Sequence, residues 1–452
     1  MAARRVRWAA AVLAAVALVA LFAAPSASPT EPKYPRRIPV RLWHMWTAEW
    51  AVVVERICQR FNESQDTYEV IPLSVPAQGA DSKFLLAAVG GDPPDVMAQW
   101  NPVIPTWAEN RLLTPLDELM TAEERERFER EAYPVVKKLG YYKGRLYGIT
   151  TGMNAFALYY LPAHFRDAGL EPEIPPTLEE LVAVGDRLKR VDAAGHLSRI
   201  GYLPTHGLGG MFGISPVFGG GFYDWKTGTV TIDTPENLRT LRFLVEQRRK
   251  LGFDEVVRFE SGLNTQSFAG GWPFIGGAYS ATQDGQWRVE QIRKYAPRLQ
   301  YRTAPLPPPR EGGVPLAGAS NGNFLIIPRA SRNPKGAFEF VKFWTGVSRP
   351  ERAAEFYTWG GWLPISPAVV NAPIYQEYLR KNPQFKTFVE LIASPNLEVY
   401  PPVPYQVFLM DQITRVEDLA VRGTLTPEQA LQRLKVALEQ ERARRRQMGY
   451  VE

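Results

Sequence analysis

The sequence predicts an α/β fold in which a mostly parallel sheet is covered by helices on both faces. Between residues 38 and 91, apolar strands at Ile38–Trp43 and Tyr68–Val75 alternate with helices at Glu49–Phe61 and Lys83–Val89. Such βαβ alternation places successive strands parallel to one another. The chain has 452 residues, of which 45% are apolar, so it is long enough to bury two cores.

Start signals in the sequence mark the later helices. Thr177 and Glu180 form a capping box ahead of one helix. Thr234-Pro235, Asn333-Pro334 and Thr426-Pro427 each place a proline at the first helical position of another. We expect the arginines that end the last helix to complement its dipole rather than to form a docking patch.

Two of the predicted strands end in side chains that suit a binding cleft. The first ends in Trp43-His44-Met45-Trp46, and the segment Met97–Asn101 follows the turn Gly90–Val96. In an open α/β sheet the carboxyl ends of the strands face the ligand crevice. The sequence therefore predicts a cleft for a polar, ring-containing small molecule.

The N-terminus has the pattern of an export signal, which we assign to residues 1–28. Three arginines precede Trp8–Ala24, an unbroken apolar run of 17 residues, and small residues follow it. Seventeen residues lie at the short end of what spans a bilayer, so an uncleaved N-terminal anchor is the alternative. Residues 29–37 are polar and proline-rich, and we expect them to form a flexible leader.

Cysteine, histidine and charge exclude several classes of protein. The single cysteine, Cys58, falls on the apolar face of a predicted helix, and no cysteine near the signal could carry a lipid. We therefore expect a periplasmic protein that is not a lipoprotein. The four histidines are scattered, so no metal or other cofactor is expected. Without the signal, 50 basic side chains face 47 acidic ones, which gives no case for nucleic-acid binding.

A series of short strings runs along the chain in a fixed order. They are the Trp-His-x-Trp strand end, Phe61-Asn62-Glu63, the Gly-Asp-Pro-Pro-Asp-Val turn, Leu113–Asp117, Gly144–Ile149, Leu158–Tyr160, Phe165–Leu170, Pro176–Leu181, Phe268–Gly271, Leu325–Pro328, Ala337–Trp344 and Trp362–Pro364. In this order they resemble the extracellular solute-binding proteins of carbohydrate ABC importers, the family that includes maltose-binding proteins. The sequence departs from that family at Tyr160-Leu161-Pro162 and Gly271-Trp272-Pro273, which leaves the identity of the ligand open.

The resemblance implies a type II periplasmic-binding-protein fold, with two α/β lobes joined by a hinge and the ligand cleft between them. The N-terminal lobe would comprise residues 38–150 and return for about 313–362. The C-terminal lobe would comprise residues 151–312 and be completed by about 363–452. The implied function is to capture a sugar and deliver it to the transmembrane subunits of an ABC permease, which work with cytoplasmic ATPase subunits. We expect a monomer.

The residue types near the predicted cleft suit a sugar, whose ring faces need aromatic platforms and whose hydroxyls need short polar partners. Such a site gains affinity only if several platforms act together, since each hydrogen bond adds about 0.5 to 1.5 kcal/mol. The candidate ligand-binding residues are Trp43, His44, Trp46, Gln99, Trp100, Asn101, Asn154, Trp272, Tyr279, Asp284, Asn321, Trp359 and Trp362. By contrast, Trp50, Trp107 and Trp344 fit helical core faces.

Two alternatives stay open. A secreted glycan-acting enzyme would need two carboxylates across a bond, and Glu49, Asp92, Asp95 and Asp284 are the nearest acids. Local roles in turns and at a helix start explain the first three better. The same fold could instead bind glycerol 3-phosphate or another anion, but 43–46 and 99–101 contain no Lys or Arg. A neutral mono- or oligosaccharide is therefore preferred.

Overall fold

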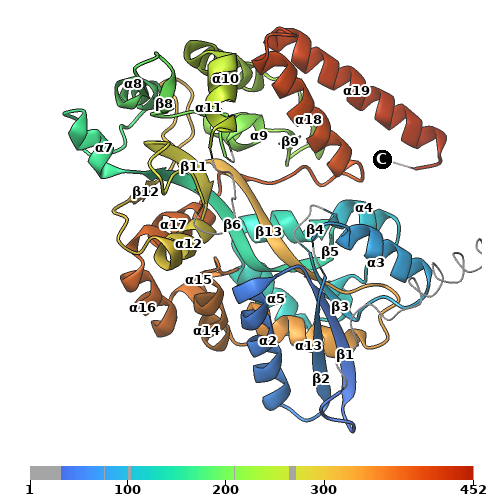
Figure 1. The fold of residues 1–452 in the computed structure, drawn as a ribbon. Coiled ribbons are helices and arrows are strands. Elements are labelled where there is room, and N and C mark those ends of the chain that lie inside the picture. The colour runs from blue at the N-terminus through green and yellow to red at the C-terminus, as the bar shows by residue number, and fades with distance from the viewer. Residues whose placement is uncertain (1–31, 76, 100–102, 208, 264–270, 451–452) are drawn as a thin grey trace, which may run out of the picture.

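The protein is built around an eight-stranded mixed sheet, seen in Figure 1. This computed structural model describes residues 32–75, 77–99, 103–207, 209–263 and 271–450. The order of strands along the sheet is β11-β6-β13-β3-β1-β2, with β12 also paired to β6 and β14 (Leu397–Glu398) also paired to β13.

The first part of the sheet is parallel, as the sequence predicts. Strand β1 (Ile38–His44) lies between β2 (Tyr68–Ser74) and β3 (Val96–Gln99), and both neighbours run parallel to it. The predicted helices are also confirmed. They are α2 (Ala48–Glu63), α3 (Ala80–Val89) and α13 (Pro334–Thr345).

Two long strands pair antiparallel with all their neighbours except β14, and here the expectation of a mostly parallel sheet is wrong. Along Gly148–Ala155, β6 (Gly148–Tyr160) pairs antiparallel with β13 (Gly318–Ile326). From Phe156 onward it pairs instead with β11 (Ala281–Gly285) and, along Leu158–Tyr160, with β12 (Arg302–Ala304). β6 and β13 both pass between the two lobes, and they do so in opposite directions.

Local caps explain where the helices of the second lobe begin. The Thr177 hydroxyl accepts from the Glu180 amide at the start of α8 (Leu178–Leu188), and Thr234 plays the same part for α10 (Pro235–Leu251). A reciprocal box between Thr426 and Gln429 starts α19 (Pro427–Gln447), which packs with α18 (Gln406–Val421). Each cap satisfies backbone N–H groups that have no partner within the helix.

The remaining elements are short. The helices are α4 (Ile104–Glu109), α5 (Ala122–Glu131), α6 (Pro134–Gly140), α7 (Pro162–Asp167), α9 (Gly210–Ile214), α11 (Phe253–Ser261), α12 (Trp287–Tyr295), α14 (Pro350–Gly360), α15 (Pro367–Val370), α16 (Pro373–Lys381) and α17 (Lys386–Ala393). The strands are β4 (Tyr141–Tyr142), β5 (Arg145–Leu146), β7 (Arg190–Val191), β8 (Leu197–Arg199), β9 (Tyr223–Asp224) and β10 (Thr229–Val230), with 3-10 turns at 116–118, 215–218 and 383–385.

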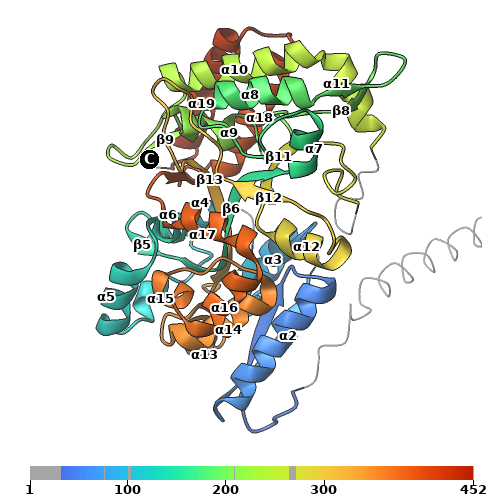
Figure 2. The same ribbon diagram turned by 90° about the vertical axis from the view of Figure 1, so that its left-hand side faces the viewer.

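The C-terminal segment divides between the two lobes. Helices α15 and α16 pack on α14, and the Tyr375 hydroxyl donates to the Trp362 carbonyl at 3.0 Å. Helices α18 and α19 pack instead on α10, on the opposite side of the molecule in Figure 2. The domain limits drawn from the sequence stay a prediction; in this arrangement α15 and α16 pack on α14, while α17 packs on β6.

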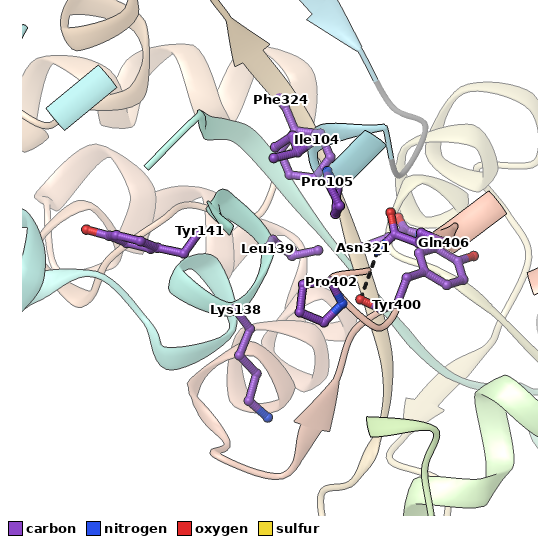
Figure 3. Close-up of a pocket in the computed structure, with 10 residues that line it drawn as sticks. All are labelled: Ile104, Pro105, Lys138, Leu139, Tyr141, Asn321, Phe324, Tyr400, Pro402 and Gln406. Atoms are coloured by element: carbon purple, nitrogen blue, oxygen red, sulfur yellow. Dashed lines mark hydrogen bonds between the residues drawn. The ribbon is translucent and has the colours of Figure 1, made fainter. Parts of the chain in front are cut away.

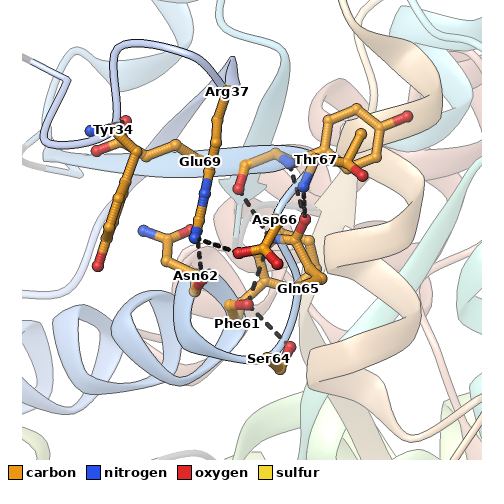
Figure 4. A network of polar contacts seen from close by, with 10 residues as sticks. Tyr34, Arg37, Phe61, Asn62, Ser64, Gln65, Asp66, Thr67 and Glu69 are labelled. Atoms are coloured by element: carbon orange, nitrogen blue, oxygen red, sulfur yellow. Dashed lines mark hydrogen bonds and ion pairs between the residues drawn. The ribbon is translucent and has the colours of Figure 1, made fainter.

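Part of the predicted leader is held against the first lobe (Figure 4). The buried carboxylate of Glu69 accepts from the backbone N–H groups of Lys33 and Tyr34 at 2.7 and 3.0 Å. Arg37 pairs with Asp66 at 2.8 Å. Lys33, Tyr34 and Arg37 therefore have partners in the first lobe even though the composition of this segment is typical of a flexible one.

The single cysteine is confirmed as a core thiol. Cys58 is buried on α2, and burial raises its pKa, so the reactive thiolate is disfavoured. Within the described parts of the chain, no helix combines the length and the hydrophobicity that a membrane span requires.

Candidate ligand-binding site

The end of β1 supplies one aromatic wall of the candidate site. Trp43 is half-buried, and the ammonium of Lys83 on α3 lies 5.1 Å from the centre of its ring. His44 is buried, with no hydrogen-bond partner for its Nδ1 among the described residues. Burial lowers the pKa of His44 to about 4, so its ring is neutral at neutral pH.

Behind this wall, three tryptophans form one cluster. The ring of Trp46 lies 5.4 Å from Trp344 and 5.5 Å from Trp362, and the last two are 5.7 Å apart. Trp362 also covers β6 so closely that a side chain at Gly152 would meet it at 3.1 Å. Trp344 is in the core, as the sequence predicts. Trp46 and Trp362 are only 8% and 5% exposed, so here their faces are occupied by protein.

The end of β3 contributes an amide. Gln99 is buried, and its Nε2 donates to the Asp81 carboxylate in the first turn of α3. This bond joins the β3 end to the helix that carries Lys83. The predicted site residues Trp100 and Asn101, which follow Gln99, lie outside the described residues.

Where the strands cross between the lobes, three amides form a chain of hydrogen bonds. Asn154 Nδ2 on β6 donates to Asn321 Oδ1 on β13 at 2.6 Å, and Gln286 Nε2 donates to Asn154 Oδ1 at 2.9 Å. Asn321 also hydrogen-bonds the side chain of Tyr400. The structure thus brings together the predicted site residues Asn154 and Asn321. Their partners Gln286 and Tyr400 were not among the predicted site residues.

Gln286 and Tyr400 carry no sequence signal beyond their polar type. Gln286 precedes α12 at its N-cap, and Tyr400 stacks on Phe212 at 4.3 Å. Figure 3 shows Asn321 beside Tyr400 and Gln406, whose Nε2 donates to the Tyr400 carbonyl at 3.0 Å. The hollow that these residues line holds only about 20 Å³, which is room for about one water molecule rather than for a sugar.

In the second lobe, Asp284 is held in a buried ion pair. Its carboxylate accepts from Arg288 Nε at 2.8 Å and from the Gly285 amide at 2.7 Å. Burial raises the pKa of Asp284, and the guanidinium opposes that shift. The same guanidinium lies 4.6 Å from the ring centre of Trp272, which is buried edge-on against Tyr159. Asp284 and Trp272 therefore belong to one supporting unit.

Tyr279 belongs to a second buried unit. Its ring stacks on His206 at 4.0 Å, and His206 Nδ1 lies 3.2 Å from Glu260. Arg248 approaches the same carboxylate at 3.8 Å. Tyr279 is fully buried, so protein covers its ring in this arrangement.

Strand β11, with Thr282 and Gln283, and the loop before α9, with Thr205, supply further polar atoms in the second lobe. Thr205 Oγ1, Thr282 Oγ1 and Gln283 Oε1 are buried and have no hydrogen-bond partner among the described residues. The loop before α9 lies directly on this strand, since a side chain at Gly207 would come within 2.4 Å of the Gln283 carbonyl. Unpaired buried polar atoms cost free energy, so they are natural partners for ligand hydroxyls.

Trp359 lies apart from these residues. Its ring, on α14, carries the guanidinium of Arg56 at 3.7 Å and packs beside Phe356. Arg56 belongs to α2, so Trp359 joins α14 to α2 instead of lining the crossing strands. The structure does not bring it together with the other predicted ligand residues.

The acids weighed for catalysis all have partners within the fold. Glu49 pairs with Lys294 at 3.0 Å and Asp92 with Arg41 at 2.9 Å. Asp95 is buried and accepts from the backbone N–H groups of Arg41 and Asn333, each at 2.9 Å. Asp284 is likewise paired to Arg288, so each of these carboxylates has a local structural role in the fold.

This two-lobed mixed α/β fold is that of periplasmic solute-binding proteins. The chain matches the family of bacterial extracellular solute-binding proteins over residues 56–387. It therefore belongs to that family, whose members bind small-molecule solutes and work with ABC permeases.

Individual relatives differ in what they bind. The chain is 24% identical over 414 residues to the sn-glycerol-3-phosphate-binding periplasmic protein UgpB of Salmonella typhimurium, covering 87% of this chain and 90% of that one. Among solved structures, CpMnBP1 with mannotriose bound has a TM-score of 0.76 at 23% identity, covering 89% and 100% of the two chains. The sugar-binding protein MalE of Xanthomonas citri has a TM-score of 0.72 at 21% identity, covering 92% and 100%.

Proposed function

We propose that this protein captures a neutral mono- or oligosaccharide outside the cytoplasm and delivers it to an ABC import permease. The observation that carries the proposal is the combination of an aromatic side chain at the end of β1 with buried, uncharged polar atoms on β11 and in the loop before α9. Trp43 offers a ring face, while Thr205, Thr282 and Gln283 offer buried atoms that still need partners. This combination suits the apolar faces and hydroxyl rim of a sugar.

Charge supports a neutral ligand. In the second lobe, the guanidinium of Arg288 is already engaged by Asp284 and Gln291, and Arg248 lies near Glu260. An anion bound beside them would have to compete with carboxylates that are a few ångströms away. Several of the solved structures with this fold have names that state an oligosaccharide ligand, such as mannotriose.

A second candidate ligand is an organic phosphate such as glycerol 3-phosphate. The ammonium of Lys83 at the Trp43 ring favours it, because it is a cation at the edge of the proposed cleft. The similar UgpB protein of Salmonella typhimurium is named as an sn-glycerol-3-phosphate-binding periplasmic protein. The identity of 24% leaves the ligand of this chain to be measured.

The proposed cycle needs motion between the lobes. β6 and β13 pass from one lobe to the other, so bending near the Asn154–Asn321 bond would open and close the cleft. A closed form could bury enough ligand surface on both walls to reach micromolar affinity, which needs about −8 kcal/mol. The permease, with its ATPase subunits, would then receive the solute. On this proposal the chain is periplasmic and has no catalytic role.

Isothermal titration calorimetry on ligand-stripped protein tests the proposal. Mannobiose, mannotriose, maltotriose and glycerol 3-phosphate would be compared in one buffer, and each sugar would be checked for turnover by chromatography. One-to-one binding of a sugar without turnover supports the proposal. Binding of glycerol 3-phosphate alone selects the second candidate, and consumption of a glycan would overturn both.

A further inference from the structure

A cavity of about 450 Å³ lies in the first lobe and is lined by none of the residues of the candidate sugar site. One wall is the turn from α2 to β2, with Ser64, Gln65 and Thr67, which Figure 4 shows in detail. The other wall is the connection from α13 to α14. Its volume lies within the roughly 300 to 1,000 Å³ that is usual for small-molecule sites.

Three cationic side chains line this cavity, and only one is neutralised. Lys342 donates to Glu124 and to Glu339, both at 2.8 Å. Arg349 and Arg352 form no ion pair with any of the residues that the structure describes. Of the four charged side chains that line the cavity, Glu339 pairs with Lys342, so Arg349 and Arg352 leave the cavity with a net positive charge.

The setting of Arg352 makes this arrangement unfavourable when the cavity is empty. Its guanidinium lies 4.1 Å from the ring centre of Phe343, and its Nε is buried with no hydrogen-bond partner among the described residues. Burial, together with the nearby charge of Arg349, lowers the pKa of Arg352. A bound anion would pair with both guanidinium groups.

We propose that this cavity binds an oxyanion, a phosphate or phosphodiester group, held by Arg349 and Arg352. The planar guanidinium groups match the geometry of phosphate oxygens, and the hydroxyls of Thr67 and Ser348 line the space beside them. The cavity is larger than a bare phosphate needs, so it has room for a small organic group attached to the anion. The group could come from a free solute or from a phospholipid headgroup. This inference does not rest on the proposed sugar ligand.

Titration with inorganic phosphate at constant ionic strength tests the site, with thermal stability of the purified full chain as the readout. The wild-type protein should show a saturable rise in Tm. Arg349→Gln and Arg352→Gln should each weaken phosphate binding at least about tenfold, by analogy with other charge-assisted contacts. Arg298→Gln, which removes one exposed arginine elsewhere, should leave it unchanged.

Arg349 is exposed, so its variant should fold even if loss of Arg352 disturbs the packing on Phe343. Equal phosphate binding in wild type and Arg349→Gln would place the anion elsewhere, for instance in the sugar cleft, and would overturn the inference. Mannotriose binding measured on the same variants should be unaffected, which separates failure of this site from failure of the proposed function.

Flotation with vesicles distinguishes the two sources of the anion. A lipid headgroup would be identified if the protein floats with phosphatidylglycerol vesicles but not with phosphatidylcholine vesicles. Arg349→Gln should then reduce this binding, and Arg298→Gln should not. Saturable phosphate binding without such retention would identify a free anion. Absence of both would overturn the inference.

Discussion

The two walls of the candidate site differ in how their side chains are satisfied. In the first lobe, the rings of Trp46, Trp344 and Trp362 pack on one another. In the second lobe, support comes from the Asp284–Arg288 pair. The first wall is held by apolar contact and the second by paired charge. The predicted ligand residues are therefore of two kinds: those that can touch a solute and those that hold the wall in place.

The largest effect should come from Trp46→Ala. Removing a ring packed between two other tryptophans leaves a cavity, and such changes cost about 3 to 5 kcal/mol. Urea unfolding monitored by circular dichroism would measure the free energy of unfolding. Trp46→Phe should recover part of the loss. A loss of unfolding free energy below about 1 kcal/mol would show that Trp46 does not support the wall. Trp46 would then again be a candidate for contact with the ligand.

Asp284→Asn should have the next largest effect. It keeps the shape of the side chain but leaves the Arg288 charge buried without its partner, at a cost of about 1.5 to 3 kcal/mol. The same unfolding measurement applies. Arg380→Gln, which breaks an exposed pair with Glu377, should cost close to nothing. Equal stability of the Asp284→Asn variant and the wild type would contradict a supporting role for the pair.

His44 should make stability depend on pH. Its pKa is about 4 in the folded protein and 6.5 ordinarily, so the unfolded chain binds more protons between these values. The free energy of unfolding should therefore rise with pH from 4 to 6.5, by up to about 1.4 kcal/mol per unit, and level off above. In His44→Gln this rise should be smaller. His164, whose pKa burial also lowers to about 4, contributes equally to both proteins. An unchanged slope in the variant would contradict the prediction.

The smallest effect on stability, but a clear one on binding, is expected from Trp43→Ala. Trp43 is half-buried and contacts Lys83, so its loss should change the free energy of unfolding by less than about 1 kcal/mol. Affinity for the sugar found by calorimetry should fall about tenfold, which corresponds to one lost aromatic platform. Trp359→Ala is the matched control and should leave affinity unchanged, because its ring packs against Arg56. Loss of affinity in the control instead would relocate the site.

Local signals were sufficient to predict most of the helices and the parallel strands. The hydroxyls of Thr177, Thr234 and Thr426 each cap their helix by accepting from the amide three positions on, although the predicted Thr177–Glu180 box forms only this one of its two bonds. The parallel pairing of β1 with β2 and β3 likewise follows from short βαβ units. The antiparallel crossing of β6 and β13 did not follow, since its partners are more than 160 positions apart.

The sequence by itself determined the family, the α/β fold and the presence of aromatic and amide residues at the strand ends. These properties depend on local periodicity, caps and ordered motifs. Only the tertiary structure decided that Trp46 and Trp362 cover each other, that Trp359 faces α2 and that Gln286 completes the amide chain. The physical reason is that exposure and hydrogen-bond partners depend on distant segments, and the identity of a residue type does not specify which of them it will meet.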